Sequence, residues 1–370
     1  MRVRSFVAAV AAAFLVAAPV LAQPSRYGPE RGGEDETGPY EVVANWPQPV
    51  PGFEGYRWGS TAGVFAETPN RIFIFQRGLA PPSPAQGGPP APATSLKPQW
   101  THCLMVVDGN GKLIEAWTEH DKLFVRPHKV LISPYDPDKH VWVVEDGAHQ
   151  VLKFTNDGKK LVMALGEAKT PGNDDKHFAR PTDIAWLPDG TFFVTDGYTN
   201  TRVVKFDRNG KFLMSWGKPK PAGAAKPGPG EFNTVHGIAI DNQRRVYVSD
   251  RSHSRIQIFD ENGKYLDEWT NIRQPYHLYM AADQHLWVAD GVSNKILKYD
   301  LTGKLLESWG TYGQFPGGLW GTHQISVDQE GNLYTAEVFN GRAQKFRPRK
   351  GVDRARLAGP PLRDPRPGSR

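Results

Sequence analysis

The sequence has almost no cysteine and few long hydrophobic runs. Cys103 is the single cysteine among 370 residues, so no disulfide can form within the chain. Zinc modules with several cysteine ligands and cysteine-bound iron–sulfur clusters are excluded for the same reason. Beyond the N-terminal segment, no stretch approaches the roughly 20 apolar residues that a transmembrane helix needs. The rest of the chain therefore predicts a protein without a stable membrane span.

An excess of one charge is also missing from the body of the chain. The formal net charge is +6, but Arg2 and Arg4 lie in the N-terminal segment. Residues 347–370 carry eight basic and two acidic residues, which leaves the remainder about −2. A nucleic-acid-binding protein needs a basic patch on its folded surface. We therefore predict no nucleic-acid partner.

The residues that are abundant favour a soluble, turn-rich fold. Hydrophobic residues make up 39% of the chain, and 11 Trp and 18 Phe argue against disorder. The 38 Gly and 32 Pro disfavour long helices. The composition therefore suits a globular protein built from short strands and turns.

Residues 1–22 predict a signal peptide. Arg2 and Arg4 form a basic start, an apolar run follows from Phe6 to Leu21, and small residues at positions 20 and 22 fit cleavage. The alternative is an uncleaved membrane anchor, although the run is short for a span. We expect an exported protein, periplasmic or secreted, whose next segment, 23–39, is disordered.

An internal repeat organises the remaining chain. Its unit is a turn followed by a strand, which reads Gly-Lys, then four variable residues, then Trp. An apolar residue stands four positions before each glycine, and three copies have the Asn-Gly pair of a hairpin turn. The four copies are Gly111–Trp117, Gly210–Trp216, Gly263–Trp269 and Gly303–Trp309, and a degenerate copy runs from 154 to 158.

A second hairpin lies upstream of these copies. Its strands alternate β-branched and aromatic residues, as in Thr191-Phe-Phe-Val-Thr-Asp196. Four antiparallel strands in about 40–50 residues are typical of a propeller blade. The repeats therefore predict an all-β protein, a six-bladed β-propeller over residues 40–347.

The two ends of the repeat region predict how the ring closes. The sixth repeat, 323–346, lacks a fourth strand, and residues 40–46 form a strand without a partner of its own. We expect that strand to complete the last blade and remove the exposed edge. A Pro-rich insertion occupies residues 79–98, and residues 348–370 predict a basic, disordered tail.

Histidine recurs at one position of alternate blades. The first strand of a blade lines the central channel, so the residues that start it surround one mouth. His128 precedes Asp146 by 18 residues, and in the next four blades a residue precedes Asp196, Asp250, Asp290 or Glu337 by 14. Those four residues are Thr182, His236, Tyr276 and His323.

Alternate blades of a six-fold ring are a third of a turn apart. We therefore expect His128, His236 and His323 to converge as a metal site with an open position. The expected ion is zinc, although imidazole also suits copper, iron and nickel. The alternative is that each histidine only bonds to neighbouring loops. His149 and His253 are expected beside the site, with His277 as a spare ligand.

Loops after the second strands add a tyrosine and two arginines at the same mouth. We expect Tyr198 to lie between Arg77 and Arg251, because positive charge favours the phenolate form of a general base. The alternative is that the two arginines pair with blade aspartates such as Asp250.

Two resemblances accompany these residues. The run from Asp250 to Phe259, Asp-x-x-x-x-Arg-Ile-x-x-Phe, resembles NHL repeats. Arg126-Pro-His128-Lys-Val-Leu-Ile and Asp196-Gly-Tyr-Thr-Asn-Thr-Arg202 resemble the peptidyl-α-hydroxyglycine α-amidating lyases (peptidylamidoglycolate lyases). Similar matches are Arg180-Pro-Thr-Asp-Ile-Ala, Gly210-Lys-Phe-Leu-Met-Ser-Trp-Gly217 and Ser249-Asp-Arg-Ser-His-Ser-Arg-Ile-Gln257.

The second resemblance implies an activity and a set of site residues. It implies a six-bladed lyase that cleaves an N-acyl-α-hydroxyglycine, as a small molecule or a peptide C-terminus, to an amide and glyoxylate. It places a catalytic zinc on the three histidines, a catalytic role on Tyr198, and substrate binding on Arg77 and Arg251.

The chain also departs from this family. The family has an aspartate that binds a structural calcium, and Gln324 stands in its place. The backbone calcium ligands would be Val64 and Val130, so calcium binding is left open. The family's disulfides cannot form here.

Two other functions remain as alternatives. One is a different metal-dependent propeller hydrolase, such as a gluconolactonase-like enzyme, whose carboxylate and Asn ligands differ from an all-histidine set. The other is a non-catalytic NHL scaffold, which needs no metal and no role for Tyr198. The sequence leaves the natural substrate and the oligomeric state undetermined.

Overall fold

A computed structural model describes residues 36–82 and 91–362. The predicted signal peptide and residues 23–35 of the predicted disordered segment lie outside the described residues. Strands dominate the described chain, with four short 3₁₀ helices at η1 (Ala93–Ser95), η2 (Thr118–Leu123), η3 (Arg251–His253) and η4 (Arg354–Arg356). None of the described helices has the length and hydrophobicity to cross a membrane.

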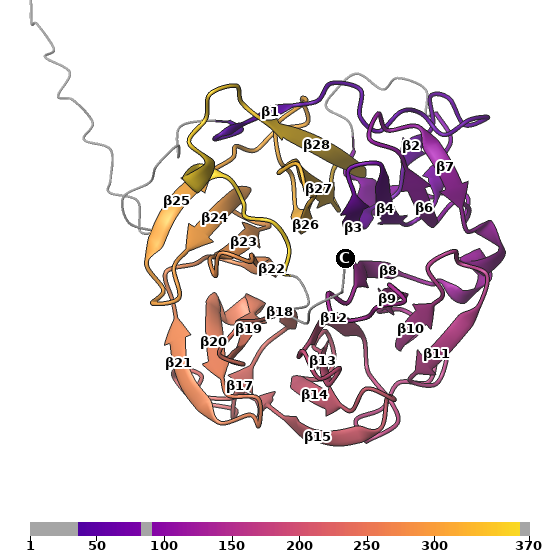
Figure 1. The fold of residues 1–370 in the computed structure, drawn as a ribbon. Coiled ribbons are helices and arrows are strands. Elements are labelled where there is room, and N and C mark those ends of the chain that lie inside the picture. The colour runs from indigo at the N-terminus through magenta and orange to yellow at the C-terminus, as the bar shows by residue number, and fades with distance from the viewer. Residues whose placement is uncertain (1–35, 83–90, 363–370) are drawn as a thin grey trace, which may run out of the picture.

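Six four-stranded antiparallel sheets surround a central axis (Figure 1). The predicted six-bladed β-propeller is therefore confirmed. The inner strand of each sheet lines the axis, and the outer strand lies at the rim. From inner to outer strand, the blades are β3 (Thr61–Thr68), β4 (Arg71–Gln76), β6 (Leu104–Val107), β7 (Leu113–Ala116); β8 (Pro127–Ile132), β9 (Val141–Glu145), β10 (Gln150–Phe154), β11 (Leu161–Leu165); β12 (Pro181–Trp186), β13 (Phe192–Asp196), β14 (Arg202–Phe206), β15 (Phe212–Trp216); β18 (Val235–Ile240), β19 (Val246–Asp250), β20 (Arg255–Phe259), β21 (Tyr265–Trp269); β22 (Pro275–Met280), β23 (Leu286–Asp290), β24 (Lys295–Tyr299), β25 (Leu305–Trp309); and β26 (Thr322–Val327), β27 (Leu333–Glu337), β28 (Arg342–Pro348), β1 (Tyr40–Val42).

The repeated tryptophan packs one blade against the next at three of the junctions, where Trp117, Trp216 and Trp269 meet Gly158, Gly263 and Gly303. Gly303 starts the outer hairpin of blade 5 with a φ of 83°, which the residue adopts without the strain that a side chain would bring. A Cβ at Gly303 would lie 2.6 Å from the indole of Trp269 in blade 4. Gly158 meets Trp117 of the preceding blade in the same way. The turn glycine and the tryptophan of the repeat therefore form one contact between blades.

Pairing of the two chain ends closes the ring as predicted. β1 lies antiparallel to β28, with Tyr40 opposite Pro348 and Val42 opposite Phe346. The strand ends at Val42, although Val43 still donates a backbone hydrogen bond to Lys345. The closing strand thus leaves the last blade without an unpaired outer edge.

The prediction of a disordered tail is wrong for residues 348–362. Leu357 and Ala358 are buried in the same hydrophobic cluster as Tyr40 and Trp309. The Ala358 amide donates to the Tyr40 hydroxyl at 2.7 Å. Composition indicated disorder because proline and arginine dominate the segment, but a few apolar side chains suffice to anchor it. Residues 36–39 are likewise placed, with Thr37 buried.

A β-bulge begins the inner strand of every blade. In each case the first residue pairs with the last residue of the second strand, and the next residue is skipped by the register. A bulge redirects a side chain relative to the sheet. The skipped residues are Ala62, His128, Thr182, His236, Tyr276 and His323, which include the three predicted histidines.

The strand register also corrects one prediction about which residues occupy the same position in different blades. Pro127 pairs with Glu145, so Glu145, and not Asp146, corresponds to Asp196 and Asp250. Asp146 instead shares its repeat position with Arg77 and Arg251, directly after the second strand. The prediction was wrong because the hairpin between the first two strands is longer in blade 2 than in the other blades. The spacing from the channel residue to the end of the second strand is therefore different there.

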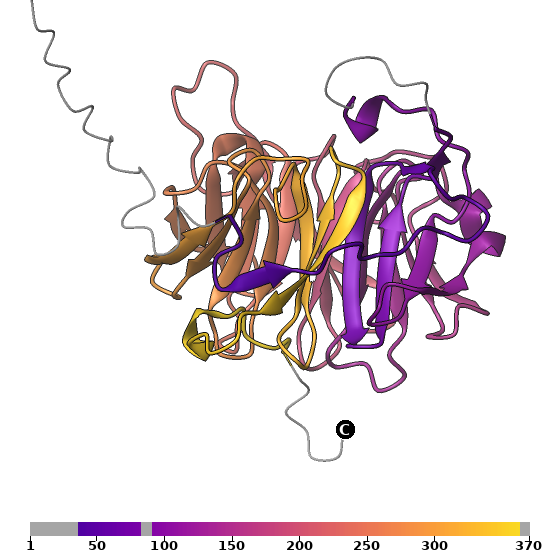
Figure 2. The ribbon, with the colours of Figure 1, turned by 90° about the horizontal axis from the view of Figure 1, so that it is seen from above.

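Two insertions rise from the face that carries the starts of the inner strands (Figure 2). One is the predicted segment 79–98, which contains β5 (Leu79–Ala80), paired with β2 (Arg57–Trp58), and η1. Its central residues, 83–90, lie outside the described chain. The other, between blades 3 and 4, contains β16 (Lys218–Pro219) and β17 (Glu231–Phe232).

Gly197 provides a test of how tightly the inner strands pack. A Cβ at Gly197 would lie 1.6 Å from the backbone oxygen of Val235, and a backbone atom of a central strand cannot move aside cheaply. We expect Gly197→Ala to destabilise the fold by about 3 kcal/mol or more. Gly228→Ala is the control, because its Cβ would meet nothing closer than 3.5 Å. Thermal unfolding of both variants checks this, and equal midpoints would contradict the packing.

Candidate metal centre and active site

Three histidines from alternate blades meet on the axis. His128, His236 and His323 are buried, and one nitrogen of each lies within 4.8 Å of the others. Their ring centroids are 4.5, 4.9 and 5.0 Å apart. The predicted convergence is therefore present, because the same bulge in blades 2, 4 and 6 turns each side chain inward.

Backbone carbonyls orient two of the three imidazoles. The Nδ1 atom of His236 lies 2.7 Å from the Tyr276 oxygen, and that of His323 lies 2.8 Å from the Ala62 oxygen. Because a carbonyl only accepts, each Nδ1 carries the proton and each Nε2 keeps its lone pair. Second partners of this kind commonly fix histidine ligands of metals.

The three imidazoles are held in the form that binds metals. Burial lowers the pKa of His128, His236 and His323 well below the usual value, and neighbouring positive groups lower it further. A neutral imidazole is the ligand form of histidine. Three neutral nitrogen donors on one point fit a transition-metal ion with an open coordination position.

Tyr198 reaches the same point from the loop after β13. Its hydroxyl lies 2.9 Å from Nε2 of His236 and 3.2 Å from Nε2 of His128. The Arg251 guanidinium donates to that hydroxyl at 3.4 Å. Cations also flank the tyrosine ring, with Arg180 at 4.4 Å and Arg251 at 5.2 Å from its centroid.

Arg77 and Arg251 both lie at this mouth without an ion pair to any described carboxylate. Arg77 donates twice to the Pro127 oxygen, at 3.1 and 3.2 Å. Asp250, the suggested partner of Arg251, is bound by Arg255 at 2.8 Å and by His253 at 3.0 Å. Neither arginine therefore makes a direct ion pair with a described blade aspartate, although burial, which lowers the pKa of Arg77, is opposed by the charge of Asp146.

The other histidines near the mouth have structural roles. His277 accepts a hydrogen bond from the Ile325 amide at 3.3 Å and lies outside the three-histidine cluster. His149 accepts from the Arg180 amide at 3.1 Å. The expectation of His277 as a spare ligand is therefore not met by its position.

The described residues do not fit a calcium ion at the position that the family resemblance implied. The Gln324 amide group donates to the Val130 oxygen at 2.8 Å. One of the two backbone oxygens that the resemblance implied as ligands, those of Val64 and Val130, therefore already has a hydrogen-bond partner. Gln324 also supplies no negative charge. Calcium sites need several oxygen ligands that face the ion.

A buried lysine, which the sequence did not lead us to predict, supplies positive charge in this part of the channel. Lys129 follows the channel histidine of blade 2, and its ammonium group donates to the His323 oxygen at 2.5 Å. Burial lowers the pKa of Lys129 to about 8, against the attraction of Asp183. The signal for it was a lysine inside an otherwise apolar inner strand.

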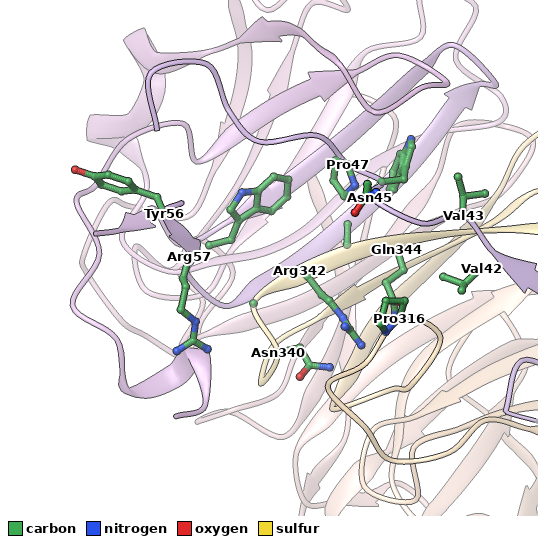
Figure 3. Close-up of a pocket in the computed structure, with 14 residues that line it drawn as sticks. Val42, Val43, Asn45, Pro47, Tyr56, Arg57, Pro316, Asn340, Arg342 and Gln344 are labelled. Atoms are coloured by element: carbon green, nitrogen blue, oxygen red, sulfur yellow. The ribbon is translucent and has the colours of Figure 1, made fainter. Parts of the chain in front are cut away.

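A groove of about 310 Å³ lies away from the histidines, between β28 and the segment from Val42 to Pro47 (Figure 3). It is lined by two arginines: Arg342 is bound to Glu337 and to backbone carbonyls, and Arg57 donates to the Ala91 oxygen. None of the three histidines lines this groove. The groove is therefore separate from the three-histidine site, where we expect the chemistry.

Comparison with known proteins agrees with this geometry. A family model for the NHL repeat matches residues 232–259, which span the first three strands of blade 4. Peptidyl-α-hydroxyglycine α-amidating lyase 1 of Drosophila melanogaster is 28% identical over 266 residues, 66% of this chain and 48% of that protein. The resemblance to the α-amidating lyases is confirmed.

Longer relatives and solved structures complete the comparison. Peptidyl-glycine α-amidating monooxygenase B of Xenopus laevis is 28% identical over 314 residues, 80% of this chain. The chain spans about a third of the two Xenopus relatives, 35% and 32% of their lengths. A streptogramin B lyase structure covers 83% of this chain and 96% of its own, with a TM-score of 0.52 and 15% identity, which shows the fold alone. Together the relatives and the fold make the chain a lyase-like β-propeller.

Elemental analysis tests the metal centre. We expect about one transition-metal ion per purified chain and no stoichiometric calcium, because three nitrogen donors converge whereas the Val130 oxygen is already bonded to the uncharged Gln324. His236→Ala should remove the transition metal, whereas His253→Gln, a histidine on the same face outside the cluster, should retain it. Wild-type protein with bound calcium, or without transition metal after reconstitution, would contradict these assignments.

Proposed function

We propose that this chain is an exported, zinc-dependent lyase that cleaves an N-acyl-α-hydroxyglycine to an amide and glyoxylate. The observation that carries the proposal is a tyrosine hydroxyl held 2.9 Å from one nitrogen of a buried three-histidine cluster. His128, His236 and His323 would hold the ion. Zinc on three imidazoles supplies a Lewis acid with an open coordination position.

Arg77 and Arg251 would bind the carboxylate of the substrate. Neither guanidinium has a direct ion pair with a described carboxylate, and burial lowers the pKa of Arg77 despite the opposing attraction of Asp146. A substrate carboxylate would relieve that cost, and charge-assisted hydrogen bonds are stronger than neutral ones. The two arginines share one repeat position in blades 1 and 4, so they approach the axis from opposite sides.

Tyr198 would move the proton. In the proposed step its phenolate takes the proton of the α-hydroxyl group, the C=O bond of glyoxylate forms, and the C–N bond breaks. The electron pair goes to nitrogen, and the proton passes from Tyr198 to the amide. Atoms and charge balance, and nothing is oxidised or reduced. The guanidinium of Arg251, 3.4 Å from the hydroxyl, stabilises the phenolate.

Removal of the Tyr198 hydroxyl tests this role. Tyr198→Phe keeps the ring between its two arginines, so folding and metal content should remain. Release of glyoxylate from N-benzoyl-α-hydroxyglycine should fall at least about 100-fold, the usual scale for loss of a general base. Arg77→Ala and Arg251→Ala should raise KM and lower kcat, because each would hold the carboxylate as well as steady the phenolate.

Tyr312→Phe is the matched control, because Tyr312 is 58% exposed and lies outside the cluster. Full activity of Tyr198→Phe would show that another group is the base. A metal-loaded wild type that releases no glyoxylate would remove the lyase reaction and favour the scaffold alternative.

Export has its own test. Cleavage after Ala22 predicts a mature chain that begins at Gln23. We expect N-terminal sequencing of protein from the periplasmic or culture fraction to start at that residue, and Ala22→Arg to block processing. A mature chain that retains Met1 and stays with the cell membrane would support the anchor alternative.

A further inference from the structure

One sector of the channel mouth is more cationic than the others. The residue two positions before each channel residue lies on the rim, and in the six blades it is Ser60, Arg126, Arg180, Thr234, Gln274 and Gly321. In five blades its backbone oxygen accepts a hydrogen bond from the backbone amide of the residue directly after the second strand. In blade 3 the donor is the backbone amide of Tyr198. Charge occurs at this position only in blades 2 and 3, and the blade 3 residue, Arg180, contacts the Tyr198 ring.

A buried carboxylate holds these two rim arginines together. Asp146 is fully buried, with Arg126 at 3.5 Å from one oxygen and Arg180 at 3.3 Å from the other. Asp146 occupies the repeat position that carries Arg77 in blade 1 and Arg251 in blade 4. The carboxylate therefore orients two cations toward one sector and leaves both side chains partly exposed, Arg126 at 46% and Arg180 at 29%.

Positive charge exceeds negative charge around this sector. Asp146 is the carboxylate shared by Arg126 and Arg180, while Arg77 and Arg251 have no ion pair among the described residues. The carboxylates that end the second strands of blades 2, 3 and 4 are engaged elsewhere: Glu145 accepts the backbone amides of residues 125, 126 and 148, Asp196 binds Arg202 and Asn200, and Asp250 binds Arg255 and His253. One substrate carboxylate at Arg77 and Arg251 would still leave the sector positive.

The backbone at Arg180 is left-handed, as it is at Thr234 in the same rim position of blade 4, where φ is 64°. Arg180 has a φ of 70°, and blade 6 has Gly321 at the same rim position with a φ of 67°. A large side chain in this left-handed region costs conformational energy that glycine avoids. Arg180 nevertheless stacks on the Tyr198 ring, with its guanidinium 4.4 Å from the ring centroid.

We propose that Arg126 and Arg180 form a second anion-binding subsite, so that the preferred substrate carries a carboxylate on its acyl portion. The inference rests on the proposed lyase function and names its substrate class: an α-hydroxyglycine acylated by a short dicarboxylic acid or by an acidic residue. The acyl carboxylate binds between blades 2 and 3, and the α-carboxylate binds Arg77 and Arg251.

Two pairs of compounds that differ by one charge test the subsite. N-Succinyl-α-hydroxyglycine and N-succinamoyl-α-hydroxyglycine have the same shape, and only the first has the acyl carboxylate. We expect wild-type kcat/KM for glyoxylate release to favour the succinyl compound by about 10- to 100-fold, the scale of charge-assisted hydrogen bonds. The preference should shrink as salt is raised, because both arginines are partly exposed.

Arginine variants test which residues cause the preference for the succinyl compound. Arg126→Gln together with Arg180→Gln should abolish it by lowering kcat/KM for the succinyl compound by the larger factor. Activity towards the succinamoyl compound should also fall, because Arg180 stacks on the ring of the proposed base Tyr198. Arg126→Gln alone should reduce it, which keeps the test informative if the double variant unfolds. Arg273→Gln is the matched control, because Arg273 is an exposed arginine in the loop before the inner strand of blade 5, and it should leave the preference unchanged.

Binding without turnover separates this inference from the proposed reaction. N-Succinylglycine and N-succinamoylglycine lack the hydroxyl and cannot be cleaved. Calorimetry should show tighter binding of the succinyl compound to wild type and equal binding of both to the double variant. If calorimetry gives this result but no glyoxylate is released from the hydroxylated compounds, the proposed reaction is wrong and the anion-binding subsite is still supported. Equal wild-type binding, a preference that persists in the double variant, or equal losses for both compounds would overturn the subsite.

Discussion

The pairing of β1 with β28 is the constraint on which the site depends. Three imidazoles from strands nearly 200 residues apart meet because six blades close into one ring, and that closure is made by a three-residue strand from the other end of the described chain. An open ring would separate blade 6 from blade 1, and His323, whose Nδ1 bonds to the Ala62 oxygen across that junction, would lose its orientation. The tail residues Leu357 and Ala358 reinforce the closure because they bury the Tyr40 ring.

The interior of the channel combines buried neutral imidazoles with permanent cations. Burial and nearby positive groups together lower the pKa of the histidines, so the protein prepares nitrogen ligands instead of imidazolium ions. The ammonium of Lys129 lies in the same channel, where Gln324 covers the Val130 oxygen. Burial disfavours the charged form of Lys129 and so lowers its pKa.

Function in this propeller lies where the blades differ. The bulge, the hairpin glycines and the tryptophan contacts recur because each blade must pack against its neighbours. The positions around the mouth do not recur: after the second strand, blades 1 and 4 carry Arg77 and Arg251, whereas blade 2 carries Asp146. Packing limits which residue types this position can hold. In blade 3 it is Gly197, where a Cβ would meet the Val235 backbone. Symmetric packing therefore supports an asymmetric distribution of charge.

The repeat alone determined the number of blades, the closing strand and the equivalence of His128, His236 and His323, because spacing in a regular blade translates directly into position. It also indicated Tyr198, Arg77 and Arg251, since loops at one face share a mouth. The register of blade 2 was not determined, because a longer hairpin shifted the count and hid that Asp146 occupies the position of the two arginines. Composition could not place residues 348–362 either, since two apolar side chains among many charged ones decide their packing. Which arginines are neutralised, and which carbonyls already have donors, depends on contacts between blades, and those exist only once the ring has closed.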